Sequence, residues 1–270
     1  PWASIAVPSS RTSRAAKASA STLSARYHAA GQNEGPDVAT VAGPLVDHPD
    51  VVAGTLAAGA VVVFPESLYS YSETGRPMTE ECPRGAQGGK RGVRTALLEA
   101  RAASATNTVS VVAGDFFGPR VRNAHAGERM AKPVLAGKSL MVIGNAGLPH
   151  SFTYVPDLAA AMIVAAQDPQ LWNRVWHAPT APALSQREIA EAFAAAAGAR
   201  APRVAALPGW VLRTMGLVSP GIRELAETLY QFERPFVMDS RATEAALGLQ
   251  PTPLTEAAAA TVAWWGDQER

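Results

Sequence analysis

Three segments decide the fold that the sequence predicts: VVVF at residues 61–64, KRGVRTALLEARAA at 90–103 and TVSVVAG at 108–114. VVVF consists of three β-branched valines and a phenylalanine, and it lies between Gly59 and Pro65. Because it is apolar on both faces, it is typical of a buried parallel strand. Residues 90–103 are rich in alanine and leucine, which favour a helix, and TVSVVAG predicts a second buried strand. Strand, helix and strand in this order form one right-handed βαβ crossover, the unit of a doubly wound parallel sheet.

The flanking sequence extends this α/β pattern. A helix after Ser185 has a complete capping signature, with Glu188 three residues later and Gly198 as its terminator. Beyond it the chain is expected to be mostly helical up to Trp265. The other predicted elements are a strand at 36–43, a helix within 47–60, an extended segment at 138–145, a strand feeding a helix at 152–167 and a strand at 175–181.

Composition excludes several classes of protein. The 270 residues carry a formal net charge of +1, which implies no acidic or basic partner, and the sequence lacks the basic face with stacking aromatics that nucleic-acid binding needs. One cysteine, Cys82, excludes an internal disulfide and fits a reducing, cytoplasmic compartment. No apolar run approaches the ~18–20 residues that span a bilayer. The five histidines show no ligand spacing, so no metal site is expected.

The first thirty residues contain four cations, no acids and many Ser and Ala residues. Two interpretations stay open at this point. The composition is similar to that of an organelle transit peptide, and it also suits a poorly ordered leader.

Two loops follow the best strands: FPESLYSY (64–71) and GDFFGP (114–119). Ligands bind at the carboxyl ends of the strands in open parallel sheets. The aromatic rings of these loops either stack on a planar ligand or pack under the helices.

With these landmarks, the chain resembles the NAD-dependent epimerase/dehydratase family, the extended short-chain dehydrogenases. The resemblance rests on FPESLYSY, the KxxxR helix, GDFFGP, LPHSFTYVPDLAAAM and PTPLTEAAAATVAWW, in that order, from about residue 50 to Trp265. It implies a Rossmann-type domain, an NAD or NADP cofactor and a smaller C-terminal domain over a small-molecule substrate, commonly a nucleotide sugar. It also implies a homodimer through two long helices, of which the later one is visible at 90–103.

The resemblance also implies roles for individual residues. Ser67, four residues before Tyr71, would hydrogen-bond the reacting oxygen, and Asp115 takes a place where relatives often have Asn. His150 stands where Arg is common. The implied catalytic residues are Ser67, Lys90 and Arg94; the implied cofactor-binding residues are Phe64, Pro65, Tyr71, Arg94, Asp115 and Phe116; the implied substrate-binding residues are Asn123, His150 and Arg234.

The helix at 90–103 departs from the family pattern. Active relatives place a Tyr and a Lys four residues apart, on one helix face, to exchange a proton and to hold the nicotinamide ribose. Here Lys90 and Arg94 take those two places, and no tyrosine occurs between Tyr71 and Tyr154. Arg94 could still bind ribose or phosphate oxygens. The alternative interpretation is that Lys90, Arg91 and Arg94 are a solvated basic helix start.

A second departure concerns the glycine-rich turn that clamps the dinucleotide phosphates. No GxxGxxG motif precedes Asp50. Losing even two charged hydrogen bonds at ~1.5 kcal/mol each would weaken dinucleotide binding by ~100-fold. A truncated, wrongly translated or out-of-frame amino-terminal part would explain the missing motif.

The sequence therefore predicts an α/β fold: an incomplete Rossmann-type parallel sheet with a smaller mixed C-terminal substrate domain. Residues 1–45 are expected to be a poorly ordered or atypical N-terminal segment, 46–125 the remainder of the Rossmann-type dinucleotide-binding domain, and 126–270 substrate-domain elements interleaved with the last strands of the sheet. Three functions stay open. They are an NAD(P)-dependent oxidoreductase, epimerase or dehydratase; a non-catalytic relative that binds a nucleotide or a partner; and an inactive fragment.

Overall fold

The computed structural model of the chain describes residues 5–7 and 59–268. It divides into two compact units, each made of segments that alternate along the sequence. Unit 1 comprises Pro1–Ser70, Gly85–Val112 and Ala160–Trp176, and unit 2 comprises Tyr71–Arg84, Ala113–Ala159 and His177–Arg270. The predicted strand at 36–43 and most of the predicted helix within 47–60 lie outside the described residues. The predicted division at residues 45 and 125 stays a prediction.

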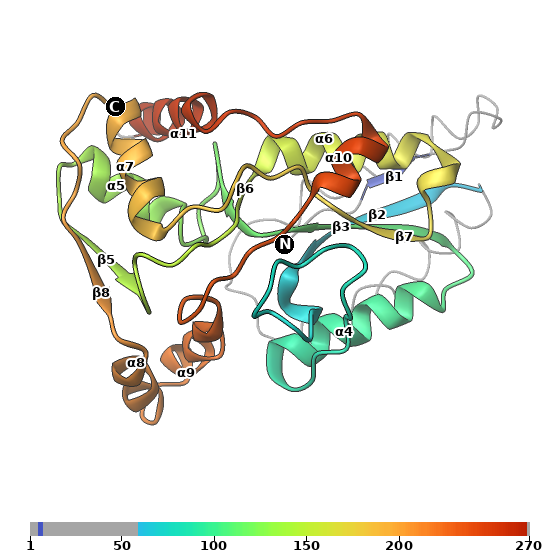
Figure 1. Ribbon diagram of the computed structural model, residues 1–270, viewed down its shortest axis with the longest axis horizontal. Helices are drawn as coiled ribbons and strands as arrows, with labels where there is room; N and C mark the ends of the chain where they lie inside the picture. Colours follow the sequence, from blue (N-terminus) through green and yellow to red (C-terminus); the bar gives the residue numbers. More distant parts are fainter. Residues whose placement is uncertain (1–4, 8–58, 269–270) are drawn as a thin grey trace. The chain divides into compact units, whose positions relative to one another are not determined.

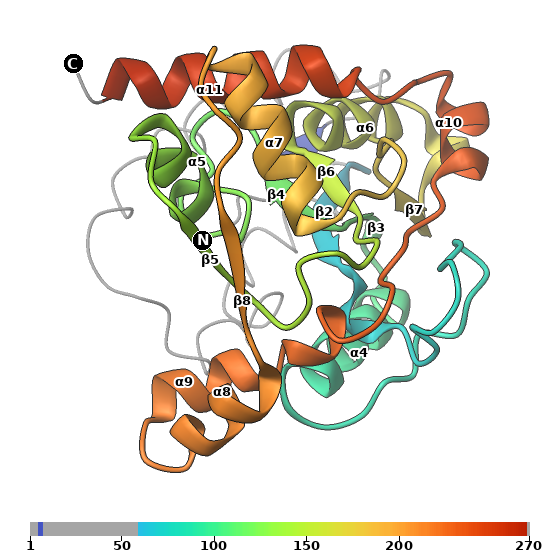
Figure 2. The ribbon, with the colours of Figure 1, turned by 60° about the vertical axis from the view of Figure 1, so that its left-hand side comes forward.

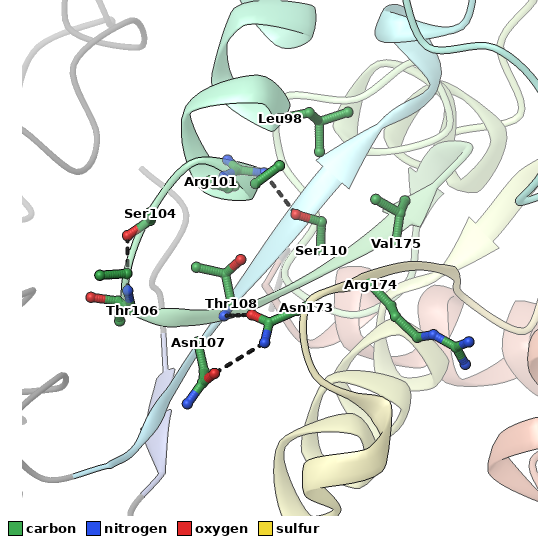
Figure 3. A pocket seen from close by; sticks show the side chains of 12 residues that line it. Leu98, Arg101, Ser104, Thr106, Asn107, Thr108, Ser110, Asn173, Arg174 and Val175 are labelled. Atoms are coloured by element: carbon green, nitrogen blue, oxygen red, sulfur yellow. Dashed lines mark hydrogen bonds between the residues drawn. The ribbon is translucent and has the colours of Figure 1, made fainter.

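Unit 1 is built on a four-stranded sheet with the order β1-β2-β3-β7. The strands are β1 (Ile5–Val7), β2 (Val61–Ser67), β3 (Asn107–Ala113) and β7 (Arg174–His177). β1 pairs with β2 in antiparallel fashion, whereas β2 and β3 run in the same direction (Figure 3). The predicted strands at 61–64 and 108–114 are thus confirmed, and β2 extends three residues beyond VVVF.

The helix α4 (Gly89–Ala102) confirms the predicted helix at 90–103 and connects the two central strands (Figure 1). The valines of β2 and β3 are almost completely buried, as the continuous apolar runs indicate. The hydroxyl of Thr95 donates to the carbonyl of Ala86 at 2.7 Å, which ties the first turns of α4 to the loop before it.

Unit 2 contains two small parallel sheets. β4 (Asp115–Phe117) pairs with β6 (Phe152–Tyr154), and β5 (Leu140–Ile143) pairs with β8 (Val204–Leu207). The predicted extended segment at 138–145 and the predicted strand before α6 (Val155–Gln167) are confirmed. β8 is a strand in a region that the sequence predicted to be mostly helical, because its alanines carry no β-branched signal.

The core of unit 2 lies between three helices, α5 (Glu128–Leu135), α7 (Gln186–Ala196) and α11 (Leu254–Gln268). They lie side by side in both views (Figures 1 and 2). Trp265 is 1% exposed in this core and Trp264 packs against it, so the tryptophan pair serves packing.

The cap of α7 has the predicted form. Ser185 Oγ accepts from the Glu188 N–H, while the Glu188 carboxylate accepts from the Ser185 N–H at 2.7 Å. Gly198 follows the helix with a φ of 64°, a conformation that glycine adopts without strain.

The remaining elements of the described residues are short. None of the helices that the structure describes is both long and apolar enough to cross a membrane. The short elements are η1 (Leu68–Ser70), η2 (Pro169–Leu171), α8 (Gly209–Gly216), α9 (Pro220–Ala226), η3 (Leu229–Gln231) and α10 (Arg241–Leu247).

Candidate functional site

The carboxyl end of β2 carries three of the predicted site residues: Phe64, Pro65 and Ser67. Side chains alternate between the two faces of a strand, so Pro65 and Ser67 share one face and Phe64 and Glu66 share the other. Pro65 and Ser67 are partly buried, whereas Phe64 is 5% exposed and Glu66 is 2% exposed. The guanidinium of Arg101 lies over the Phe64 ring at 4.1 Å from its centroid.

Glu66 is the centre of a buried charge cluster in unit 1. Its Oε2 accepts from Arg101 at 2.7 Å, and its Oε1 lies 3.3 Å from Arg94. The backbone N–H of Ser67 donates to Oε1 at 2.8 Å, and the Ser67 hydroxyl reaches the same oxygen at 3.4 Å. A buried carboxylate needs such partners, because burial of an unpaired charge is costly. Sequence reasoning missed Glu66, since its partners on α4 are 28 and 35 residues away.

Arg94 and Lys90 come from the first two turns of α4, four residues apart and therefore on one helix face. Both side chains are partly buried, and Arg94 is 21% exposed. Arg91, between them, donates from Nε to the Tyr69 carbonyl at 3.4 Å. The structure thus brings Ser67 and Arg94 together, since both contact Oε1 of Glu66. α4 contains no tyrosine.

Asp115 and His150, two further predicted site residues, form a pair in unit 2. His150 Nε2 lies 3.0 Å from Asp115 Oδ2, and His150 Nδ1 lies 3.3 Å from the Gln231 carbonyl oxygen. Each ring nitrogen of His150 therefore faces an oxygen that can accept a hydrogen bond. The His150 ring stacks on Phe232 at 4.7 Å and is 2% exposed, whereas the Asp115 side chain is 17% exposed.

The electrostatics of this pair favour an ionised Asp115. Burial pushes the pKa of Asp115 upward, but the charge and the hydrogen bond of His150 outweigh it, and the pKa lies below its ordinary value. Burial lowers the pKa of the neighbouring His125, which packs edge-on against Phe232 at 4.5 Å. Sequence reasoning placed Asp115 and His150 near a ligand but did not predict that they contact each other.

The other predicted residues of unit 2 lie in different surroundings. Phe116 is partly buried in β4, while Asn123 and Arg234 are exposed. Tyr71 is fully buried, and its hydroxyl lies 2.5 Å from His177 Nε2. Burial raises the pKa of Tyr71 far above its ordinary value, despite the opposing charge of Arg84.

The second ring nitrogen of His177 also has a partner. Nδ1 donates to the Asp239 carbonyl at 2.7 Å, so Nε2 is left to accept from the Tyr71 hydroxyl. The ligand-binding roles expected of Tyr71, Phe116, Asn123 and Arg234 stay predictions.

No group of three or more His, Cys, Asp or Glu side chains within residues 5–7 and 59–268 is arranged to hold a metal ion. Asp157, in the first turn of α6, accepts from the N–H and the hydroxyl of Thr252 at 2.9 and 2.6 Å. Its role is structural, because these bonds connect the first turn of α6 to the segment before α11.

Comparisons with solved structures place the chain in a well-populated fold. The structure of gox2253 has a TM-score of 0.66 at 18% identity, covering 88% of this chain and 76% of that one. The dTDP-glucose 4,6-dehydratase of Bacillus anthracis scores 0.58 at 14% identity, with coverages of 77% and 62%. The UDP-glucose 4-epimerase of Thermotoga maritima scores 0.62 at 13% identity, with coverages of 82% and 68%.

These likenesses confirm the predicted α/β fold with parallel strands of the Rossmann type. The chain spans 62–76% of the lengths of these three solved chains. A comparison with curated proteins gave no match. Residues 50–175 match the model of the NAD dependent epimerase/dehydratase family, a segment that includes β2, α4, β3 and the Asp115–His150 pair. The predicted resemblance to the NAD-dependent epimerase/dehydratase family is thus confirmed for residues 50–175, a little under half of the chain.

Proposed function

We propose that this chain is an NAD(P)-dependent oxidoreductase that acts on a hydroxyl or carbonyl group of a nucleotide sugar. The family supports this proposal, and so do two solved relatives. The Bacillus anthracis dehydratase was solved in complex with NAD, and the Thermotoga maritima epimerase with UDP-glucose.

The observation that carries the proposal is the shared contact of Ser67 and Arg94 with Oε1 of Glu66. It brings a serine hydroxyl and a fixed cation together at the carboxyl end of β2, where ligands bind in parallel sheets. The Ser67 backbone N–H makes the shorter bond to Glu66, at 2.8 Å, while the hydroxyl contact is long, at 3.4 Å. The hydroxyl can therefore rotate toward a substrate oxygen while the backbone N–H of Ser67 keeps its hydrogen bond to Glu66.

The charges at this site suit a cofactor with ribose and phosphate oxygens. Arg101 holds Glu66 at 2.7 Å and largely compensates its charge, while Arg94 contacts Glu66 at 3.3 Å and is still 21% exposed. The other guanidinium N–H groups of Arg94 fit oxygen acceptors. When bound, a nicotinamide supplies hydride donation or acceptance. Arg94 would orient it, Ser67 would hold the substrate oxygen, and Lys90 would pass a proton to or from that oxygen.

In unit 2, Asp115 would be the member of the Asp115–His150 pair that faces a ligand. His150 is buried, and its Nε2 contacts only one of the two carboxylate oxygens of Asp115, Oδ2. His150 would therefore orient Asp115. This deepens the sequence-based prediction, in which both residues contact cofactor or substrate.

A second candidate function is nucleotide binding without turnover. Two observations favour it. α4 carries Lys90 at the position where the resemblance implies a catalytic tyrosine. The hydroxyl of Tyr71 is buried against His177.

Fluorescence titration with NADH and NADPH, combined with turnover assays on UDP-glucose and dTDP-glucose, separates the two functions. An oxidoreductase binds a reduced cofactor saturably and loses about 100-fold in turnover in a Ser67→Ala variant. A binding protein shows the same titration and no turnover. No saturable binding of either cofactor up to about 1 mM, the upper end of typical ligand affinities, contradicts both.

A further inference from the structure

The helical hairpin of α8 and α9, residues 209–226 of unit 2, exposes large apolar side chains. Its two helices lie side by side in both views (Figures 1 and 2). Within residues 59–268, six large apolar side chains are exposed, and four of them belong to α8 and the turn that follows it. These four, defined here as the hairpin patch, are exposed to 68% (Trp210), 43% (Met215), 81% (Leu217) and 88% (Val218).

The buried face of α8 shows why these side chains point outward. Gly209, Leu212 and Gly216 are the buried residues of α8, and their spacing of three and four residues places them on one helix face. A Cβ atom at Gly216 would lie 3.1 Å from the Cα atom of Arg223, so this glycine lets α8 approach α9 closely. A surface helix normally buries its large apolar residues. α8 instead buries two glycines and one leucine, and it leaves the large side chains of the hairpin patch exposed.

The four side chains of the hairpin patch are neighbours. The Leu217 N–H donates to the Thr214 carbonyl at 3.2 Å. The Val218 N–H donates to the Met215 carbonyl, also at 3.2 Å, so the helical winding continues past the end of α8. Because residues three, four and seven apart share a helix face, Trp210 and Leu217 lie in one row. Met215 and Val218 form the row beside it. Contiguous apolar patches of this kind mark interaction sites.

The size of the hairpin patch fits a protein–protein interface. A large side chain covers roughly 200 Å², so four side chains at these exposures present on the order of 500 Å² of apolar surface. Apolar atoms make up about 56–65% of a protein–protein interface. An apolar centre of about 500 Å² therefore corresponds to about 800 Å² per partner, which is the area that a stable dimer of standard size buries.

The charges of the hairpin favour a second copy of the chain over a lipid surface. Residues 209–228 contain two arginines and two glutamates, so their net charge is zero, and all four are exposed: Arg213, Arg223, Glu224 and Glu227. An interface between two identical copies joins the same surface of each and must be self-complementary. Exposed charges of both signs meet this requirement. Helices that bind anionic lipids are instead rich in Lys and Arg.

We propose that the hairpin patch is the contact surface of a homodimer, in which α8 of one copy packs against α8 of a second copy across a two-fold axis. The patch forms the apolar centre of the interface, and the exposed arginines and glutamates form its polar rim. Trp210 is the anchor, because tryptophan is enriched among the residues that dominate binding energy. This surface is separate from α4, the helix through which the family resemblance implies a homodimer.

Sedimentation equilibrium of the full chain tests the proposal. The expected result is a monomer–dimer equilibrium within about 1–200 μM, because interfaces of this size have Kd values at or below the micromolar range. A Leu217→Ser/Val218→Ser double variant should raise the Kd by at least about 100-fold, because both copies in the dimer lose the two apolar contacts. Both side chains are exposed in the single chain, so the far-UV circular dichroism spectrum of the variant should match that of the parent.

Two single variants sharpen the test. Trp210→Ser should raise the Kd by at least about 10-fold, since it removes the anchor. Ile163→Ser is the matched control, because Ile163 is 49% exposed on α6, outside the hairpin patch, and it should leave the Kd unchanged.

Three results would overturn the proposal. The first is a chain that stays monomeric up to about 200 μM. The second is a dimer whose Kd is the same for the parent and the patch variants, which would mean that the copies meet at another surface, such as α4. The third is a monomeric chain that co-sediments with phosphatidylcholine/phosphatidylserine vesicles and loses this binding in the Leu217→Ser/Val218→Ser variant, which would assign the patch to lipid.

Discussion

The variant Glu66→Gln should destabilise the chain strongly, because it removes the one carboxylate that the buried Arg101 and the partly buried Arg94 share. Glu66 is 2% exposed, and its oxygens lie 2.7 Å from Arg101 and 3.3 Å from Arg94. Glutamine retains an oxygen for the Ser67 N–H but no charge. Breaking a buried ion pair by removing one partner costs about 3–5 kcal/mol. We expect about 3 kcal/mol, because Arg94 is 21% exposed and regains some hydration.

Urea unfolding of the full chain at neutral pH measures this free energy. Glu99→Gln is the matched control, since Glu99 is on the same helix but exposed, and it should change the free energy of unfolding by less than about 0.5 kcal/mol. A Glu66→Gln/Arg101→Gln double variant should be more stable than the sum of the single changes predicts, by about 1 kcal/mol or more. A Glu66→Gln effect no larger than that of Glu99→Gln would refute the reasoning, because Glu66 would then not be the buried centre of the cluster.

Three further predictions concern unit 2. Burial holds the pKa of His125 below the ordinary value of 6.5. The free energy of unfolding should therefore fall as the pH drops below about 6.5 and through the pKa of the folded state. In urea titrations at about pH 7.5 and 5.5, a His125→Gln variant should show a smaller difference between the two free energies of unfolding. Ser185→Ala should cost about 1 kcal/mol, since it removes the N-cap of α7; an unchanged urea midpoint would contradict the capping role. Tyr71→Phe should cost about 1–3 kcal/mol by leaving the acceptor nitrogen of His177 buried and unpaired, and thermal melts of the variant and its parent provide the check.

The sequence could predict the elements whose periodicity or capping is local. The buried strands at β2 and β3 have continuous apolar runs, and the capping box of α7 is contained in four residues. β8 escaped prediction because Val204–Leu207 is a short, alanine-containing run whose strand character depends on pairing with β5.

The candidate site was harder to predict, because its contacts join distant residues. Ser67 and Arg94 could be named from a family resemblance, yet Glu66 between them could not, since a lone charged residue in a loop-like motif is normally exposed. Tyr71 and His177 are 106 residues apart in the sequence, so no local sequence pattern predicts their contact.

The central claim is that this chain binds a nicotinamide cofactor through Arg94, beside Ser67, which would hold the substrate oxygen. The most direct measurement is a fluorescence titration of the full chain with NADH and NADPH, for the parent, for Arg94→Gln and for Arg76→Gln, an exposed arginine of unit 2. The account predicts saturable binding with a Kd on the order of 0.1 mM, about 100-fold weaker than a ~1 μM site, for these 270 residues, which contain no GxxGxxG motif before Asp50. Arg94→Gln should weaken it by about 10-fold, and Arg76→Gln should not change it. Saturable binding that is equal in all three proteins, or no binding up to about 1 mM, would contradict the account.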